Sequence, residues 1–243
     1  LRDLRARLGL EYDQLERGIL HLFHSAAEFA QAPARARLLA DFGIEARICD
    51  RDACLAIEPA LGAQADALAG GLYAPGDESG DAFRFTQALA GHVAAQGGTL
   101  LWETEILRLV TGRDGGAIAG VEVRTADGTV DTLHTDACVV CLGSYGPRLL
   151  APLGERLAIY PVKGYSVTAP VLDPARAPSV SLTDESRRIV CSRLGARLRI
   201  AGTAELNGFD TRVRPERVAP ILAWAQRSFP GAIDAERAAE KER

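Results

Sequence analysis

Residues 137–150 read ACVVCLGSYGPRLL, a continuous apolar run followed by a glycine-containing turn and the start of an amphipathic helix. An apolar run of this length, bounded by a turn, is typical of a buried strand in a parallel sheet. Open α/β sheets bind ligands beyond the carboxyl ends of such strands. Gly143 and Gly146 lack the Cβ that would block close approach, and the next helix begins with free N–H groups that favour an anion. The segment therefore predicts a strand that meets a nucleotide at Gly143.

The same run contains Cys138 and Cys141, which have the spacing of a redox or zinc pair. In a strand, residues three apart point to opposite faces, and this opposes a shared metal or disulfide. The five scattered cysteines indicate a reducing compartment and not a disulfide framework. His21 and His24 have no further ligands at a suitable spacing, so no metal site is predicted.

Helices and strands are expected to mix on the amino-terminal side of this run. The expected helices are residues 33–42, a short helix capped by Asp50 or Asp52 that ends near Pro59, and residues 83–96. Residues 99–110 are expected to form a strand, and residues 121–125 and 129–133 a hairpin with a type I′ turn at Asp127-Gly128.

A glycine- and acid-rich loop is expected at 70–80, with Asp77, Glu78 and Asp81 at its end. These carboxylates lack the spacing of a calcium-binding loop. Two interpretations remain open. The carboxylates could bind a cation or act as a general base, or Asp81 or a neighbour could cap the helix that follows.

Beyond residue 150 the pattern becomes antiparallel. Strands are expected within 156–170, 187–194 and 197–206, followed by a helix over 215–228 with a kink at Pro220. The fold class predicted is mixed α/β (α+β), with two lobes interleaved in sequence.

The composition limits the function. The 243 residues are 47% hydrophobic with a formal net charge of −4, which predicts a packed core and argues against binding to nucleic acid. No apolar stretch approaches the roughly 20 residues of a membrane-spanning helix. The sequence starts at Leu1 and has no methionine, so we expect further sequence upstream.

Tyr160, Lys163, Tyr165 and Glu205 fall on the expected antiparallel strands, whose alternation could direct some of them into one cleft. A lysine and a glycine inside an apolar strand are otherwise unfavourable, which draws attention to Lys163 and Gly164. The alternative is an exposed strand face with Lys163 in water. No catalytic acid–base pair is identified, and no nucleophile elbow or P-loop is present.

Four ordered blocks together resemble one family. GGLYAPGDESGDAFRFTQALA, VVCLGSYGPRLL, IYPVKGYSVTAPV and RLRIAGTAELNGFD are similar to the small catalytic subunit of bacterial FAD-dependent D-amino-acid dehydrogenases, within the D-amino-acid oxidase and glycine oxidase group. The resemblance runs from about residue 1 to residue 231. The sequence lacks the amino-terminal glycine fingerprint and the carboxyl-terminal arginine-bearing segment of that family. We therefore expect the chain alone to hold FAD weakly and to be inactive.

The resemblance implies the central part of a two-lobed FAD/NAD(P)-binding-type flavoprotein with an antiparallel substrate-domain sheet. Residues 1–80 would belong to the substrate domain, 81–150 to the FAD-binding domain and 151–230 to the sheet that covers substrate and flavin. Residues 231–243 would be a frayed or foreign tail.

The resemblance also implies site residues. The FAD contacts would be Ile106, Cys141, Gly143, Ser144 and Gly164. The substrate pocket would be lined by Lys163, Tyr165 and Glu205. The loop with Asp77, Glu78 and Asp81 would help to cover that pocket.

The activity implied is oxidative deamination of D-amino acids to 2-oxo acids and ammonia, with hydride transfer to FAD and electrons passed to a quinone or another acceptor. The resemblance places the enzyme in the cytoplasm or at the inner face of the plasma membrane. One alternative is a related flavin enzyme acting on glycine, sarcosine or proline, and another is a noncatalytic or truncated flavoprotein. Oligomeric state is left open.

Overall fold

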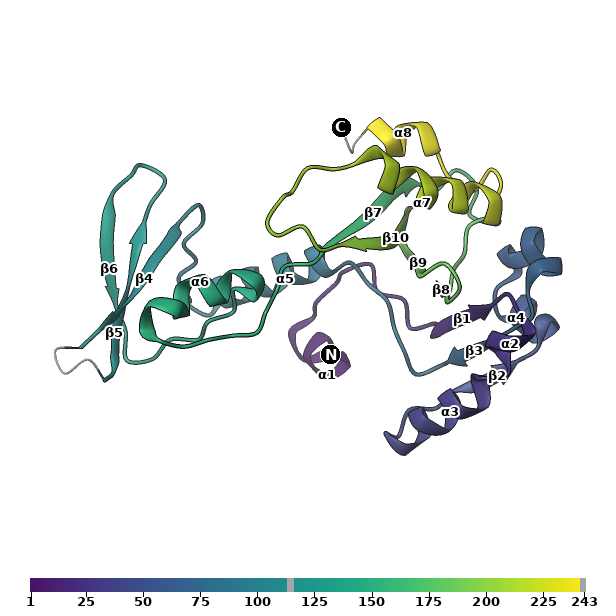
Figure 1. Cartoon of the computed structure of the whole chain (residues 1–243), viewed down its shortest axis with the longest axis horizontal. Coiled ribbons are helices and arrows are strands. Elements are labelled where there is room, and N and C mark those ends of the chain that lie inside the picture. The colour runs from purple at the N-terminus through teal and green to yellow at the C-terminus, as the bar shows by residue number, and fades with distance from the viewer. Residues whose placement is uncertain (113–115, 241–243) are drawn as a thin grey trace. The chain divides into compact units, whose positions relative to one another are not determined.

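The computed structural model describes residues 1–112 and 116–240, which form two compact units (Figure 1). Unit 1 comprises Leu1–His92, Lys163–Glu205 and the residues from Asp210 onward, and unit 2 comprises Val93–Val162 and Leu206–Phe209. The two units interleave along the chain, and the predicted mixed α/β class is confirmed. The assignment of residue ranges to a substrate lobe and an FAD lobe stays a prediction.

Unit 1 is built on a seven-stranded sheet of order β2-β3-β1-β8-β9-β10-β7. The strands are β1 Ile19–Phe23, β2 Arg47–Cys49, β3 Gly70–Ala74, β7 Lys163–Pro170, β8 Ser181–Asp184, β9 Ile189–Leu194 and β10 Arg197–Glu205. Its pairings are antiparallel except that of β1 with β8. The expected antiparallel region is therefore present, although β7 begins at Lys163 and residues 156–162 form no strand.

The glycine-rich stretch expected to be a loop begins as the buried strand β3. Its glycines make room for close packing, since a Cβ on Gly71 would lie 2.8 Å from Sγ of Cys54. The prediction of a loop was therefore wrong for 70–74, because the missing side chains allow a buried strand where polarity suggested exposure.

The helices of unit 1 largely follow the sequence signals. They are α1 Arg2–Leu8, α2 Ala26–Phe29, α3 Ala32–Asp41, α4 Arg51–Ile57, the 3₁₀ helix η1 Pro59–Ala67, α5 Ala82–Ala95 (which continues into unit 2), α7 Pro215–Ser228 and α8 Ala235–Glu240. Asp50 caps α4 by accepting a hydrogen bond from the N–H of Ala53 (2.8 Å), and Asp81 caps α5 by accepting from Phe83 (3.0 Å). These caps confirm the helix starts that the sequence predicted.

The core of unit 1 lies between the sheet and α7, which contacts β7 and β10 (Figure 1). Val218, Ile221 and Trp224 supply the buried face of α7. The expected frayed or foreign tail is not observed in the described residues, because α8 contacts β7 and Ala238 is buried in the same core as Ala232.

Unit 2 contains a three-stranded antiparallel sheet of β4 Glu105–Thr111, β5 Ile118–Arg124 and β6 Val130–His134. The predicted hairpin is confirmed, but its turn is different. Gly128 has φ +87° whereas Asp127 is not among the residues with positive φ, so a type I′ turn, which needs positive φ at both central residues, is not formed. Glu105 begins β4, so residues 99–104 precede the strand.

The apolar run 137–142 does not form the predicted buried parallel strand. Val139 is 84% exposed, and Cys138 and Cys141 are exposed thiols. The physical reason is that a strand needs a pairing partner for its backbone groups, and none of the described strands pairs with this run; the sheet of unit 2 contains only β4, β5 and β6. The turn and helix beyond it are present as η2 Gly143–Tyr145, α6 Gly146–Leu150 and η3 Ala151–Leu153.

Candidate functional site

A β-bulge in β10 determines which way Glu205 points. Leu198, Ile200 and Gly202 alternate toward the buried side, but the register with β7 shifts between Gly202 and Ala204. Thr203 occupies the bulge with φ +58°, which is unusual for a β-branched residue. Because one residue is inserted in the alternation, Glu205 lies on the buried side.

Glu205 meets two predicted site residues there. Tyr165 Oη donates a hydrogen bond to Oε2 of Glu205 (2.5 Å), and Nζ of Lys163 lies 3.1 Å from the same oxygen. Tyr165 is 5% exposed and Glu205 8% exposed. The ammonium of Lys163 also lies 5.3 Å from the centre of the Tyr165 ring. The three side chains predicted to line one pocket therefore converge, and their role in binding substrate stays a prediction.

Three residues of the following segment complete this group, which we call the Glu205 cluster: Lys163, Tyr165, Glu205, Asp210, Arg212 and Arg214. Arg214 binds the second carboxylate oxygen of Glu205 (3.0 Å). Arg212 pairs with Asp210 (2.7 Å), and its backbone carbonyl accepts a hydrogen bond from Lys163 (2.9 Å). All of these residues belong to unit 1.

The cluster holds its charged groups in their ionised forms. The hydrogen bond from Tyr165 is the main cause that lowers the pKa of Glu205, and Lys163 and Arg214 add to it against partial burial. Burial opposes the charge of Lys163, but its contacts with Tyr165 and Glu205 outweigh this and raise its pKa. Arg212 lowers the pKa of Asp210 far below its usual range. At neutral pH the cluster therefore presents fixed charges with no proton to exchange.

Two other highlighted residues of this region stay apart from the cluster. Gly164 lies between Lys163 and Tyr165 in β7, so it faces the opposite side of the strand, and open space surrounds the position of its missing Cβ. Tyr160 is 60% exposed and precedes β7.

The remaining predicted cofactor contacts lie in unit 2. Ile106 is 41% exposed in β4, next to a register shift. Cys141 lies in the exposed run, and Gly143 and Ser144 form η2. These positions do not test the predicted contacts with FAD, which stay predictions.

The turn at Gly143 has features that fit a dinucleotide. Gly143 has φ +51°, and nothing lies within 4 Å of the position a Cβ would take, so a ligand has room beside the backbone. Phe209 packs on Tyr145 with ring centres 4.8 Å apart, and the Arg148 guanidinium lies 3.7 Å from the Phe209 centre. The buried side-chain amide of Asn207 has no hydrogen-bond partner, which is a free donor and acceptor in the same unit. The residues around this turn therefore fit a bound dinucleotide.

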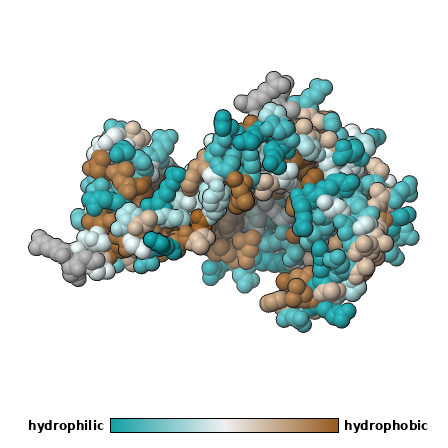
Figure 2. All heavy atoms as spheres, in the orientation of Figure 1, coloured by the Kyte–Doolittle hydropathy of each residue, from teal (hydrophilic) through white to brown (hydrophobic). Residues whose placement is uncertain are grey.

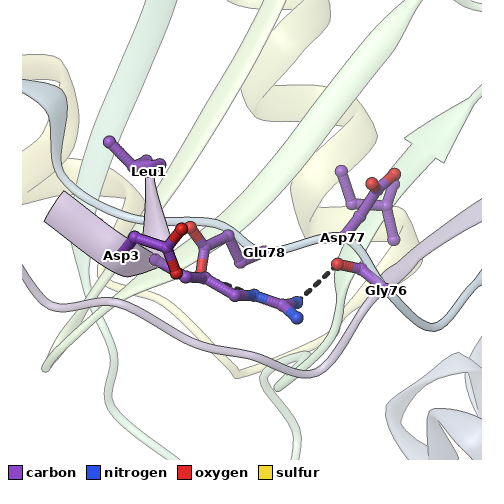
Figure 3. A pocket seen from close by; sticks show the side chains of 7 residues that line it. Leu1, Asp3, Gly76, Asp77 and Glu78 are labelled. Carbon is purple, nitrogen blue, oxygen red and sulfur yellow. Dashed lines mark hydrogen bonds and ion pairs between the residues drawn. The ribbon is translucent and has the colours of Figure 1, made fainter. Parts of the chain in front are cut away.

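The acidic loop lines a cavity of about 600 Å³ together with the start of the chain and Ile19. Figure 3 shows Asp77 and Glu78 at this cavity, where Arg2 donates a hydrogen bond to the carbonyl of Gly76 (2.5 Å). Glu78 is paired with Arg5 (2.7 Å). Two of the three loop carboxylates thus have structural partners, Glu78 in its ion pair and Asp81 as the helix cap. The cavity lining does not include the Glu205 cluster.

Sequence reasoning missed Asp210, Arg212 and Arg214. The available signal was the run GFDTRVRPER at 208–217, in which arginines closely follow a strand that ends in a glutamate. It also missed the pair of His24 and the buried Asp184, whose Nε2 and Oδ2 atoms lie 3.1 Å apart. Across the described residues, no three His, Cys, Asp or Glu side chains are placed to hold a metal ion.

A sequence profile of the DAO family, FAD dependent oxidoreductases, matches residues 1–241. The chain belongs to the DAO family. It is 46% identical over 230 residues to the D-amino acid dehydrogenase of Dechloromonas aromatica (strain RCB), covering 95% of this chain and 54% of that protein. It is also 46% identical over 238 residues to the D-amino acid dehydrogenase of Paramagnetospirillum magneticum (strain ATCC 700264 / AMB-1), covering 98% of this chain and 55% of that protein. The chain thus spans about half the length of the curated relatives it matches.

Solved structures agree with the DAO assignment. Glycine oxidase from Geobacillus kaustophilus superposes with a TM-score of 0.77 at 27% identity, over 98% of this chain and 60% of that chain. L-proline dehydrogenase from P. horikoshii gives 0.79 at 17% identity, over 94% of this chain and 59% of that chain, which shows a shared fold. The resemblance to this family and its FAD cofactor are confirmed. Within the described part of the chain, no helix is long and apolar enough to cross a membrane.

Proposed function

We propose that the protein takes part in FAD-dependent oxidative deamination of D-amino acids to 2-oxo acids and ammonia. The observation that carries the proposal is the convergence of Lys163, Tyr165 and Glu205 in a chain 46% identical to a D-amino acid dehydrogenase. FAD, when bound, supplies the acceptor for the hydride of the substrate α-carbon. The protein supplies position and environment.

The Glu205 cluster has unused hydrogen-bond donors and acceptors that suit an amino acid. Lys163 has three N–H donors, of which Glu205 and the carbonyl of Arg212 take two, so one remains for the substrate carboxylate. Tyr165 donates its proton to Glu205, so its oxygen is left to accept an N–H from the substrate amine. Glu205 holds both groups in place. No acid–base dyad is required, because the reacting species is the neutral amine.

The flavin contacts belong to the same proposal. Gly143, Ser144 and Cys141 would lie against the nucleotide at the open turn, Ile106 would offer its backbone to the adenine, and Gly164 would allow close approach of the ring system. The open space at Gly143 and Gly164 supports these roles. The loop that ends at Asp81 would help to cover the substrate.

Electrons would then pass to a quinone or another acceptor, which places the enzyme in the cytoplasm or at the inner face of the plasma membrane. Exposed apolar side chains support contact with an apolar phase. Leu38 and Phe42 are 59% and 75% exposed at the end of α3, where Figure 2 shows hydrophobic atoms at the surface. Co-sedimentation with vesicles of bacterial lipid tests this location, with Phe42→Ser expected to weaken it; unchanged sedimentation would argue against contact through α3.

A second candidate is an oxidase or dehydrogenase acting on glycine, sarcosine or proline, which the 27% identity to a glycine oxidase favours. A third is a noncatalytic or truncated flavoprotein. Expression of the complete reading frame, followed by flavin absorbance spectra without and with an amino-acid substrate in the absence of oxygen, separates the third from the others. A noncatalytic flavoprotein would be yellow but would not be bleached by any of these substrates.

Substrate profiling of that flavin-loaded protein tests the proposal. We expect reduction of an artificial quinone acceptor with D-alanine to exceed that with glycine, sarcosine or proline. A preference for glycine or sarcosine would replace the proposal with the second candidate. Lys163→Met should raise KM for D-alanine by about tenfold or more, because an ionic hydrogen bond to the substrate carboxylate is lost.

A further inference from the structure

A second, smaller cavity lies away from the Glu205 cluster and has a different chemistry. It measures about 160 Å³ and is lined by His24, Gln64, Ala67, Arg187, Trp224, Arg227 and Ser228, all in unit 1. Pockets for drug-sized ligands measure about 300–1,000 Å³. This cavity is therefore sized for a single small group.

A buried carboxylate organises one wall of this cavity. Asp184 is fully buried and accepts hydrogen bonds from Nε1 of Trp224 (2.8 Å), from the backbone N–H of Arg187 (2.9 Å) and from the Arg187 guanidinium (3.0 Å). His24 Nε2 lies 3.1 Å from the same carboxylate, and its Nδ1 lies 3.1 Å from the carbonyl of Ala67. Because both ring nitrogens face acceptors, both carry a proton in this arrangement and the imidazole is cationic.

The cavity consequently has an excess of positive charge. His24, Arg187 and Arg227 contribute three cations at the lining, against the single carboxylate of Asp184 behind it. Asp184 is saturated by donors from these side chains and from Trp224, so it does not repel an anion as a free carboxylate would. No Asp or Glu is among the lining residues.

Two donors at the cavity have no partner. Arg227 makes no hydrogen bond or ion pair with any described residue. Nε2 of Gln64 is buried and likewise has no partner. A buried N–H without an acceptor is unfavourable, and this one lines the same cavity as an unpaired guanidinium, so both can donate to an acceptor there.

We propose that this cavity, between η1 and the carboxyl-terminal half of α7, binds a small oxyanion, the carboxylate or phosphate group of a metabolite. The anion accepts hydrogen bonds from Gln64 Nε2 and the Arg227 guanidinium, with the hydroxyl of Ser228 and the remaining donors of Arg187 within the same lining. The site is separate from the residues proposed to bind the amino-acid substrate.

The chain provides its own reporter. It contains two tryptophans, Trp102 in unit 2 and Trp224 in the cavity wall. Within these 243 residues, Trp102→Phe leaves Trp224 as the sole indole fluorophore. In this background, titration with sodium phosphate and, separately, sodium acetate at constant ionic strength should change the Trp224 emission with saturation, whereas sodium chloride should not. Tighter binding of phosphate or of acetate identifies the ligand's anionic group.

Matched variants test the assignment. Arg227→Gln should weaken oxyanion binding by about tenfold or more, because it removes a charged donor. Arg217→Gln makes the same change on the same helix outside the cavity lining, so affinity should stay unchanged. Gln64→Glu should abolish binding by placing an anion in the cavity. A far-UV circular dichroism spectrum like that of the parent establishes that each variant is folded.

The proposal is overturned if neither phosphate nor acetate gives a saturable change in Trp224 emission, or if chloride gives the same change. It is also overturned if Arg217→Gln weakens binding as much as Arg227→Gln, because the effect would then be one of net charge.

Discussion

Tyr165 donates its hydroxyl proton to Oε2 of Glu205 over 2.5 Å, from an adjacent strand. This bond is the largest cause that lowers the pKa of Glu205. Tyr165→Phe should therefore raise that pKa toward the ordinary glutamate value. The measurement is a pH titration of the ¹³C-labelled Glu205 carboxyl, assigned with Glu205→Gln. Tyr160→Phe, an exposed tyrosine outside the cluster, is the control and should leave the midpoint unchanged.

Glu58 joins η1 to the segment that leads into β8. One of its oxygens accepts from the backbone N–H groups of Ser179 (2.6 Å) and Val180 (2.9 Å), and the other from Ala60 (3.0 Å). Glu58→Gln replaces one acceptor by an N–H group that faces donors, so it should destabilise the fold by about 1–3 kcal/mol. Urea unfolding measures the change. Glu45→Gln, on an exposed side chain, should alter stability little, and an equal loss in both variants would contradict the explanation.

His24 makes stability depend on pH. Its hydrogen bond to Asp184 outweighs burial and raises its pKa above the usual value of 6.5. The stabilisation is thus fully present below about pH 6.5 and is lost as pH rises through the higher folded-state pKa. The free energy of unfolding should fall in this range in the wild type and fall less in His24→Gln, as measured by urea unfolding at several pH values.

Asp184, the partner of His24, makes stability depend on pH in the acidic range. The pKa of Asp184 is lowered to about 2, through hydrogen bonds from His24, Trp224 and Arg187 that outweigh its burial. Its stabilisation is present above the ordinary aspartate pKa of about 3.9 and is lost as pH falls through about 2. Asp184→Asn should remove most of this loss in the free energy of unfolding at acidic pH, as measured by urea unfolding at several pH values. Asp66→Asn, an exposed position in η1, should preserve it.

The cysteines should fall into two reactivity classes. Cys138 and Cys141 are exposed, whereas Cys49, Cys54 and Cys191 are buried. Burial raises the pKa of Cys54 to about 12 and that of Cys191 still further, which suppresses the reactive thiolate. Under native conditions a thiol reagent should label the exposed two rapidly and the others only after denaturation. Mass spectrometry of the labelled peptides would contradict this if Cys54 reacted as fast as Cys138.

Local signals along the sequence predicted many elements well. The helix starts at Asp50 and Asp81 and the hairpin at Gly128 follow from short-range hydrogen bonding and backbone preference, which are visible in a few neighbouring residues. The strand predicted at 137–142 failed because its formation depends on a neighbouring strand, a long-range requirement. Apolar composition alone cannot show whether such a partner is available.

The site was predicted in part for the same reason. Lys163 and Tyr165 share a face of one strand, which alternation shows directly. Arg214 was missed because it lies in the irregular segment just before α7, where side chains follow no regular period. Glu205 reaches the cluster through a bulge that depends on strand pairing, so alternation named it as a candidate without showing which way it points, and the resemblance implied its place in the pocket.

The bulge at Thr203 makes the length of β10 as important as its composition. Side chains in a strand have a period of two, so the number of residues between Gly202 and Glu205 decides by its parity whether the glutamate faces the lysine or the solvent. Deletion of one residue there would turn the side chains of the following residues to the opposite face of the sheet, although those residues themselves would be unchanged. A gain or loss of two would keep the facing, so natural length variation in this segment is expected in even steps.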